Sequence, residues 1–461
     1  MKRSEALLKI CLVGLNSAWY QSNPALYYLR NAVRDLDLDI RMCEFMLSEP
    51  LTDVLARLYL EKAGVYCFSA YIWNREYLEK LVPELKKLLP KARIVLGGPE
   101  AAQGDFGLSA NDHVVTGPGE GAFRELAEAG FNLPGGIYEA PAPHLKDIGF
   151  PYCDADKPAL QNKLIYYECS RGCPFHCVYC LSALDARNEA RFDPCLKQDR
   201  ESLYGELESL MRLEPRTLKF VDRSFNIHPE LARLIWDYAI SQELACEFHF
   251  EIYPELLGSE DILLLEKAPP DRIRFEIGIQ TVNQEVNQVC RRKSDWPKTR
   301  KIIKELRERT NVCIHADLLA GLPGEGTGSI LRSLDELAAL FPHEIQLGLL
   351  KILPDTPMLD IAGQRGYLWM ERPPYQVLAS DALSCEEVFT MQDLARVINL
   401  YWNKGEFMPE WKRFLAAGHK ASSLFLDLLD FHRQRSLPLH SISQRRRGEG
   451  RRPAGRHRHR Q

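Results

Sequence analysis

The first part of the chain, from about residue 7 to residue 138, alternates short apolar runs with amphipathic stretches. The apolar runs predict strands at 10–15, 39–45, 64–69, 93–98 and 113–117. The stretches between them predict helices at 24–36, 51–61 and 75–89. The clearest is 75–89, where Leu78, Leu81 and Leu85 recur every three or four residues. This alternation predicts an α/β fold with a parallel sheet covered by helices, Rossmann-like and of the flavodoxin-like type.

A second alternation of strand and helix patterns runs from about residue 163 to residue 368. Its strands are predicted at 164–168, 217–221, 247–252, 272–279, 312–319 and 345–353. Six such units fit a partial (β/α)6 TIM-like barrel, whose active site would open at the carboxyl ends of the strands. Between the two parts, residues 139–162 carry four prolines without periodicity and indicate a linker. Residues 369–428 predict a small helical extension after the barrel.

The most informative chemistry is a cysteine triplet in the loop after the first predicted barrel strand. Cys173, Cys177 and Cys180 have the spacing CxxxCxxC. Iron–sulfur clusters are held by thiolates, and a loop lets three of them converge on one [4Fe-4S] cube while the fourth iron stays open. One alternative remains at this point, because Cys169 could supply a fourth ligand and close a structural zinc or cluster site.

This stretch resembles the signature of the radical SAM superfamily. The resemblance implies an enzyme whose open iron chelates the amino and carboxylate groups of S-adenosylmethionine (SAM). Reductive cleavage of SAM would then give a 5′-deoxyadenosyl radical that abstracts hydrogen from an inert C–H bond. Later strand ends resemble the barrel of the same family, above all Glu276-x-Gly278-x-Gln280-Thr281 and Gly321-Leu322-Pro323.

The resemblance also assigns residues to SAM, although it assigns no catalytic residue. Asp222 would lie near the methionine amino end, Glu251 and Gln280 near the ribose, and residues 319–323 beside the adenine. The full predicted set is Tyr179, Asp222, Glu251, Glu276, Gln280, Leu319, Gly321 and Pro323. Arg291 and Arg292 either face the methionine carboxylate or form a solvated basic helix end.

The loops that follow the strands of the first part resemble the cobalamin-binding domain that precedes many radical SAM modules. The predicted cobalamin set is Asn16, Ser69, Tyr71, Gly97, Gly98, Gly117, Gly119 and Glu120. Its glycines would let the backbone approach a corrin or its nucleotide tail closely. The loop 16–21 lacks the Asp-x-His-x-x-Gly motif that places histidine on cobalt, so a bound cobalamin would have no such ligand. A domain of this shape that binds no corrin is the alternative.

Together these resemblances imply a cobalamin-binding radical SAM enzyme that methylates or rearranges an unactivated carbon. The alternatives are an iron–sulfur electron-transfer or binding protein with a structural cluster, and a radical SAM enzyme without cobalamin. The segments 371–378 and 401–403 resemble an uncharacterised C-terminal extension in one subgroup of such proteins, from which no chemistry transfers. The expected electron donor is a flavodoxin or ferredoxin, and no residue identifies the small-molecule or peptide substrate.

The amino-acid composition and net charge further limit the class of protein. Hydrophobic residues make up 45% of the 461 residues and charged residues 26%, which is ordinary for an enzyme. The net charge of −4 gives no case for nucleic-acid or membrane binding. Thirteen cysteines, three of them at ligand spacing, fit the reducing cytoplasm better than a disulfide framework. No run of eighteen apolar residues predicts a transmembrane helix. The Arg-rich tail, 441–461, is predicted to be disordered.

Overall fold

The computed structural model describes residues 7–440, so the tail predicted to be disordered lies outside the described residues. These residues divide into two units. The first extends to residue 171 and includes 189–221 and 243–248, and the second holds the remainder. No helix within 7–440 is long and apolar enough to cross a membrane.

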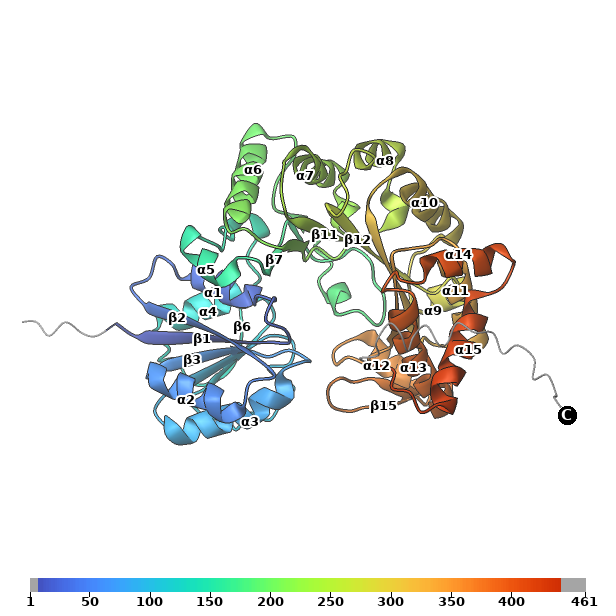
Figure 1. Ribbon diagram of the computed structural model, residues 1–461. Coiled ribbons are helices and arrows are strands. Elements are labelled where there is room, and N and C mark those ends of the chain that lie inside the picture. Colours follow the sequence, from blue (N-terminus) through green and yellow to red (C-terminus); the bar gives the residue numbers. More distant parts are fainter. Residues whose placement is uncertain (1–6, 441–461) are drawn as a thin grey trace, which may run out of the picture. The chain divides into compact units, whose positions relative to one another are not determined.

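The first unit is built on a six-stranded parallel sheet with the order β2-β1-β3-β4-β5-β6 (Figure 1). Its strands are β1 (Lys9–Asn16), β2 (Asp39–Met46), β3 (Val65–Ser69), β4 (Arg93–Gly97), β5 (His113–Thr116) and β6 (Gly136–Glu139). The helices between them are α1 (Pro24–Ala32), α2 (Leu51–Glu61), α3 (Arg75–Leu88) and α4 (Gly119–Glu128). Helices α1 and α4 pack together on one face and α2 and α3 on the other, which confirms the predicted flavodoxin-like fold. The pattern missed β6 because this edge strand is mostly exposed and has no apolar run.

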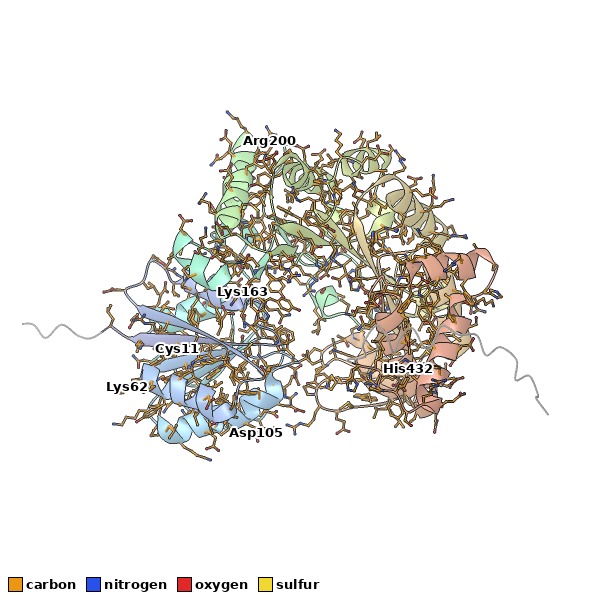
Figure 2. All side chains as sticks on the ribbon, viewed as in Figure 1. Cys11, Lys62, Asp105, Lys163, Arg200 and His432 are labelled. Carbon is orange, nitrogen blue, oxygen red and sulfur yellow. The ribbon has the colours of Figure 1, made fainter. Side chains whose placement is uncertain are left out.

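The core of this unit lies where helices cover both faces of the sheet. All five residues of β3 are buried, as expected for a parallel strand inside the sheet. Phe68 of β3 packs there with Val13 of β1 and Leu81 of α3. Cys11 of β1 belongs to the same core (Figure 2).

The turn after β4 predicts a large cost for any side chain at Gly98. Its φ of +102° suits glycine, and a Cβ there would lie 2.5 Å from the carbonyl oxygen of Ala70. We expect Gly98→Ala to lower the free energy of unfolding of the first sheet by about 2–4 kcal/mol. Gly117 is the matched control, because its φ is +71° but nothing lies within 4 Å of a Cβ, so Gly117→Ala should cost only about 1 kcal/mol. Hydrogen exchange of β3 and β4 amides checks this, and equal losses in the two variants would contradict the steric explanation.

The second parallel sheet has the strand order β14-β13-β12-β11-β10-β7. Its strands are β7 (Leu164–Tyr167), β10 (Thr217–Phe220), β11 (Glu247–Ile252), β12 (Ile273–Gln280), β13 (Cys313–Ala320) and β14 (Glu344–Leu349). The helices along this part of the chain are α6 (Lys197–Arg212), α7 (Pro229–Ser241), α8 (Ser259–Leu265), α9 (Gln284–Val289), α10 (Trp296–Arg309), α11 (Thr327–Ala338) and α12 (Pro357–Gln364). All six predicted strands are therefore present, and they follow one another as in a partial barrel.

Side chains on β11, β12 and β13 alternate strictly between two environments. One series is fully buried and packs on helices, as where Trp236 of α7 lies 5.5 Å from Phe275 of β12 between ring centroids. The other series is half-buried and includes Glu251, Glu276 and Asp317. The period of two thus places apolar residues against the helices and carboxylates on the opposite side of the sheet.

A small helical extension follows the second sheet, as predicted. A two-stranded ribbon, β15 (Leu368–Trp369) and β16 (Val377–Ala379), leads into α13 (Cys385–Tyr401), α14 (Met408–Ala416) and α15 (Ala421–Gln434). A buried cluster of Trp402, Trp411 and Phe425 holds these helices together, with ring centroids 4.5–6.2 Å apart. His432 of α15 is buried and bonds the Tyr401 hydroxyl at 2.9 Å (Figure 2).

The segment predicted as a linker contains only short elements. These are two 3₁₀ turns, at Leu145–Asp147 and Asp154–Asp156, and the one-turn helix α5 (Lys157–Leu160). Arg30 of α1 fastens it to the first sheet through Asp156, with both contacts at 2.6 Å. The four prolines therefore mark an irregular segment of the first unit that packs against α1.

Candidate functional site

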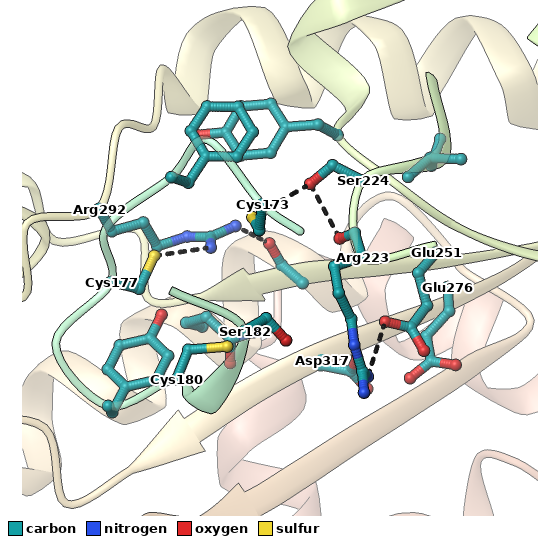
Figure 3. Close-up of a pocket in the computed structure, with 16 residues that line it drawn as sticks. Cys173, Cys177, Cys180, Ser182, Arg223, Ser224, Glu251, Glu276, Arg292 and Asp317 are labelled. Carbon is teal, nitrogen blue, oxygen red and sulfur yellow. Dashed lines mark hydrogen bonds and ion pairs between the residues drawn. The ribbon is translucent and has the colours of Figure 1, made fainter. Parts of the chain in front are cut away.

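All three cysteines of the triplet line one cavity of about 240 Å³ in the second unit (Figure 3). Cys173 and Cys177 are buried and Cys180 is half-buried. Cys169 is also buried, but it is not among the residues that line the cavity. The cavity is thus lined by the triplet without the cysteine that could have closed a four-ligand site.

Backbone hydrogen bonds fix the cysteine loop. Val178, between the second and third cysteines, donates to the carbonyl of Cys290 at 3.1 Å and accepts from the amide of Met358 at 3.0 Å. At the start of the loop, Gly172 has a φ of +91°, and a Cβ there would lie 2.7 Å from the backbone of Asp185 and Asn188. The loop is thus held at its start and between its second and third cysteines.

The donor set that lines the cavity is compatible with a cluster. Each cysteine of a three-cysteine [4Fe-4S] loop ligates a different iron of the cube, and all three thiols of the triplet line the same cavity. Within residues 7–440, no three His, Cys, Asp or Glu side chains are close enough together to hold one metal ion.

Arg292 brings a positive charge to the triplet. Its Nη1 lies 3.9 Å from Cys177 Sγ, its Nη2 donates to the carbonyl of Gly278, and its guanidinium covers the ring of Tyr253 at 5.6 Å. Its Nε is buried and has no hydrogen-bond partner among the described residues. The neighbouring Arg291 is exposed, so of the two arginines only Arg292 lines the cavity.

Burial raises the pKa of the Cys173 thiol. Its Sγ lies 3.9 Å from the hydroxyl of Ser224, in the turn after β10. An apolar wall adjoins it, where Phe175 stacks on Tyr253 with centroids 4.2 Å apart and planes within 13°. The thiols therefore face a cavity that is lined by both polar and aromatic side chains.

Carboxylates form the wall opposite the cysteines (Figure 3). Glu251 of β11, Glu276 of β12 and Asp317 of β13 all line the cavity, and Arg223 approaches Glu251 at 3.9 Å. Gln280 ends β12 at a φ of +67°, where the register of β12 against β13 shifts by one residue. This shift turns the end of β12 toward the cavity.

Of the eight residues predicted to bind SAM, four line this cavity, namely Tyr179, Glu251, Glu276 and Gln280. Asp222 is buried directly before two lining residues, Arg223 and Ser224. Leu319, Gly321 and Pro323 belong to the end of β13 and the turn after it and do not line the cavity. The assignment of all eight to SAM stays a prediction.

Several lining residues were not in the predicted set, namely Phe175, Ser182, Arg223, Ser224, Tyr253 and Asp317. A sequence signal existed for Asp317, because it is a carboxylate near the carboxyl end of the predicted strand 312–319. Tyr253 had none, since its amide contact with Asn226 at 2.8 Å joins two turns far apart in the sequence.

A charged layer on β12, β13 and β14 adjoins the cavity wall. His315 lies 3.1 Å from both Asp317 and Glu344, and Arg274 lies 3.1 Å from Glu344. Burial lowers the pKa of His315, but the two flanking carboxylates outweigh it and raise the pKa to about 10. The hydrogen bond from His315 is the main cause that lowers the pKa of Glu344 to about 2.

These shifts predict a pH dependence of stability. The His315 contribution is complete below the unfolded pKa of about 6.5 and is lost as pH rises through about 10. The Glu344 contribution is complete above about 4.5 and is lost as pH falls through about 2. We therefore expect wild type to lose several degrees of Tm between pH 6.5 and pH 10 that His315→Gln does not lose. The exposed His144→Gln should behave as wild type, and an unchanged pH profile in His315→Gln would contradict the assignment.

In the first unit, exposed aromatic residues gather in loops after β1 and β3. Trp19 and Trp73 are 61% and 51% exposed, and Tyr71 stacks on Trp73 with centroids 4.4 Å apart and planes within 6°. Large exposed aromatic side chains grouped at one edge of a sheet indicate a binding surface. The edge is the carboxyl end of a parallel sheet, where such folds bind ligands.

The predicted cobalamin residues lie along this edge, and several are already engaged inside the domain. Asn16 donates to Glu44 at 2.6 Å, Ser69 accepts from Asn23 at 2.7 Å, and Glu120 pairs with Arg171 at 2.8 Å. Gly97 ends β4 and Gly98 follows it, whereas Gly117 follows β5 and Gly119 begins α4. The assignment of these residues to cobalamin stays a prediction.

Three family models match consecutive parts of the chain. Residues 10–127 match the model of the B12 binding domain, and residues 167–337 match the model of the radical SAM superfamily. Residues 364–447 match DUF4080, a family model described as a protein of unknown function. The curated relatives include the ribosomal protein uS12 methylthiotransferase RimO of Trichlorobacter lovleyi, 27% identical over 41% of this chain and 43% of that protein. An oxygen-independent coproporphyrinogen III oxidase of Paracoccus denitrificans is 29% identical over 22% of each chain. The chain thus spans less than half the length of these relatives.

Solved structures share the fold over most of the chain. The radical SAM methyltransferase TsrM of Kitasatospora setae, with cobalamin and a [4Fe-4S] cluster bound, has a TM-score of 0.61 at 17% identity. That match covers 79% of this chain and 76% of TsrM. The cobalamin-dependent SAM radical enzyme OxsB has a TM-score of 0.65 at 12% identity, over 95% of this chain and 76% of OxsB. The matches thus identify, in this order along the chain, a B12 binding domain, a radical SAM domain and a DUF4080 segment.

Proposed function

We propose that the chain is a SAM-dependent radical enzyme that holds a [4Fe-4S] cluster on Cys173, Cys177 and Cys180. The observation that carries the proposal is that the three cysteines line one cavity with Glu251, Glu276 and other residues of the barrel strands. A cluster with one open iron supplies the electron that cleaves SAM reductively. The chain's own residues would bind SAM, orient it and keep water from the reacting end.

Arg292 is the residue we expect to bind the methionine carboxylate of SAM. Its unpartnered Nε and the unpartnered hydroxyl of Tyr253 are buried polar groups, and such groups ordinarily find a partner. A guanidinium matches a carboxylate in charge and geometry. On the opposite wall, Glu251, Glu276 and Asp317 provide acceptors for ammonium and hydroxyl groups.

We further propose that the first domain binds cobalamin and that the enzyme methylates or rearranges an unactivated carbon. The aromatic and glycine surface after β1, β3, β4 and β5 supports corrin binding. OxsB, which shares the fold, has been solved with aqua-cobalamin and SAM bound, and TsrM is a methyltransferase. With no Asp-x-His-x-x-Gly motif in the loop 16–21, cobalt would have no histidine ligand from that loop.

The proposed reductant is a flavodoxin or ferredoxin, and the proposed compartment is the cytoplasm. None of the thirteen cysteines, all of them within residues 7–440, is in a disulfide. Three thiols grouped in one cavity would be prone to oxidation in an oxidising compartment. The substrate class stays open, because the cavity has both carboxylates and an arginine.

Anaerobic reconstitution with iron, sulfide and hydroxocobalamin, followed by desalting, metal analysis and an ultraviolet–visible spectrum, tests the proposal. We expect about four irons per chain and one cobalt. Incubation with SAM and a reductant should then give 5′-deoxyadenosine, S-adenosylhomocysteine or methionine. Iron without cobalt would leave a radical enzyme with a corrin-free first domain. Iron without any SAM product, and with a paramagnetic resonance signal that SAM does not change, would indicate the electron-transfer alternative.

A further inference from the structure

The turn after β13 is held in place by the C-terminal segment that matches DUF4080. This turn, Gly321-Leu322-Pro323-Gly324, connects β13 to α11. The Tyr367 hydroxyl donates to the carbonyl of Gly321 at 3.1 Å, and the amide of Gly324 donates to Asp381 Oδ1 at 3.1 Å. Both ends of the turn are therefore bonded to residues more than forty positions later in the chain.

Packing and charge reinforce these two hydrogen bonds. Gly321 has a φ of +97°, and a Cβ there would lie 2.9 Å from Val377 of β16, so the strand packs directly against the turn backbone. Asp381 is oriented by Arg365, whose guanidinium contacts its second oxygen at 2.5 Å. Glu387 of α13 accepts from Thr327, the first residue of α11, at 2.7 Å.

The backbone of the second sheet continues into the same segment. The amide of Leu350, just after β14, donates to the carbonyl of Ala320 at 2.9 Å, and the amide of Val377 donates to the carbonyl of Leu350 at 2.9 Å. Through Val377, the C-terminal segment thus extends the backbone hydrogen bonding beside the ends of β13 and β14.

The turn is also linked to β12 through a buried carboxylate. Glu325, directly after the turn, is 1% exposed and accepts from Thr281 at 2.5 Å and from Ser329 at 2.9 Å. Thr281 directly follows Gln280, which lines the cavity. A displacement of the turn would therefore disturb the end of β12 as well.

We infer that the DUF4080 segment is a positioning element, which fixes the cavity end of β12 by holding the 321–324 turn through Tyr367 and Asp381. The inference rests on the proposed function, which places SAM in the cavity that Gln280 lines. Tyr367 and Asp381 act through the turn and touch no reacting atom. This gives a role to a segment whose family model has none.

The test measures the SAM dissociation constant of the full-length, anaerobically reconstituted protein by equilibrium dialysis. The double variant Tyr367→Phe/Asp381→Ala removes both hydrogen bonds, and we expect SAM binding to weaken about tenfold. Asp381→Asn keeps an acceptor for the Gly324 amide and should bind SAM nearly as wild type does. Asp393→Ala is the control, because Asp393 lies in the same segment but pairs only with Arg396 and Arg433 of the extension.

A second readout follows the turn itself. Hydrogen exchange of the 320–326 amides should speed up in the double variant and stay unchanged in Asp393→Ala. Wild-type affinity in the double variant, or equal weakening in Asp393→Ala, overturns the inference while leaving the proposed function intact. If wild type binds no SAM, the proposed function fails and this inference fails with it. Iron content and Tm, measured on every variant, identify a variant that has simply lost its fold.

Discussion

Cys177→Ser is expected to abolish both cluster assembly and SAM cleavage. Serine keeps the size and the polarity of the side chain but removes the thiolate, which the cluster requires. Cys177 is buried in the cavity wall beside Val178, whose backbone hydrogen bonds fix the loop. Another residue of the loop could take the place of Cys177 as a ligand only if these hydrogen bonds rearranged. We expect iron to fall from about four to less than one per chain. We expect SAM cleavage to fall by at least about a thousandfold.

Cys169→Ala is the matched control for this loss. Cys169 is buried just before the loop and does not line the cavity, so its removal should leave the iron content unchanged. Metal analysis after reconstitution, with Tm as the measure of folding, shows whether Cys169 is needed to hold the iron. Equal iron loss in Cys169→Ala and Cys177→Ser would favour a closed, four-cysteine cluster and the electron-transfer alternative.

The fold was predictable because the strands and helices of both sheets show clear hydrophobic periodicity in the sequence. The predicted strand 247–252 and the predicted helix 51–61 coincide with β11 and α2. Both have regular periodicity and well-placed turn residues at their ends. The predicted helix 24–36 instead stops at Ala32, because Val33 leaves helical geometry. Apolar residues at 33, 36 and 38 belong to the connection to β2, which a periodicity count cannot separate from a helix.

The site was only partly predictable, for a physical reason. The cysteine loop is local in sequence, and its spacing alone identifies it. The remaining cavity wall depends on which strand ends meet and on which face each side chain lies. Asp317 lines the cavity whereas Leu319, two positions later on β13, does not, although both have the same parity on the strand. Such a difference depends on how far along each strand the cavity reaches, which no local pattern encodes.

The C-terminal extension was the part least accessible from sequence. Its first helix was predictable because a capping box, Ser384 with Glu387, precedes an apolar stripe. Its contacts with the 321–324 turn were not, because Tyr367 and Asp381 stand in irregular segments with no periodicity. Polar residues in such segments are exposed in most proteins, and only the three-dimensional structure distinguishes the ones that bond to another part of the chain.

Arg292→Met should be the most damaging substitution outside the cysteines. It removes the guanidinium that approaches Cys177 at 3.9 Å and donates to Gly278, and it leaves an apolar chain of similar length. Hydrogen bonds to charged groups contribute about 1.5–3 kcal/mol, so we expect the SAM dissociation constant to rise by about 10- to 100-fold. Loss of the positive charge beside the thiolates should also make the cluster harder to reduce, which lowers its midpoint potential.

Arg291→Met provides the control, because Arg291 is the neighbouring arginine, is exposed and does not line the cavity. SAM affinity should change by less than about twofold there, as for most surface substitutions. Arg292→Lys separates charge from shape. A lysine keeps the charge near Cys177 but cannot offer two parallel donors, so the midpoint potential should recover more than SAM affinity. If Arg292→Met bound SAM as tightly as Arg291→Met, the methionine carboxylate would have to lie elsewhere. The unpartnered Nε of Arg292 would then have to serve the substrate rather than SAM.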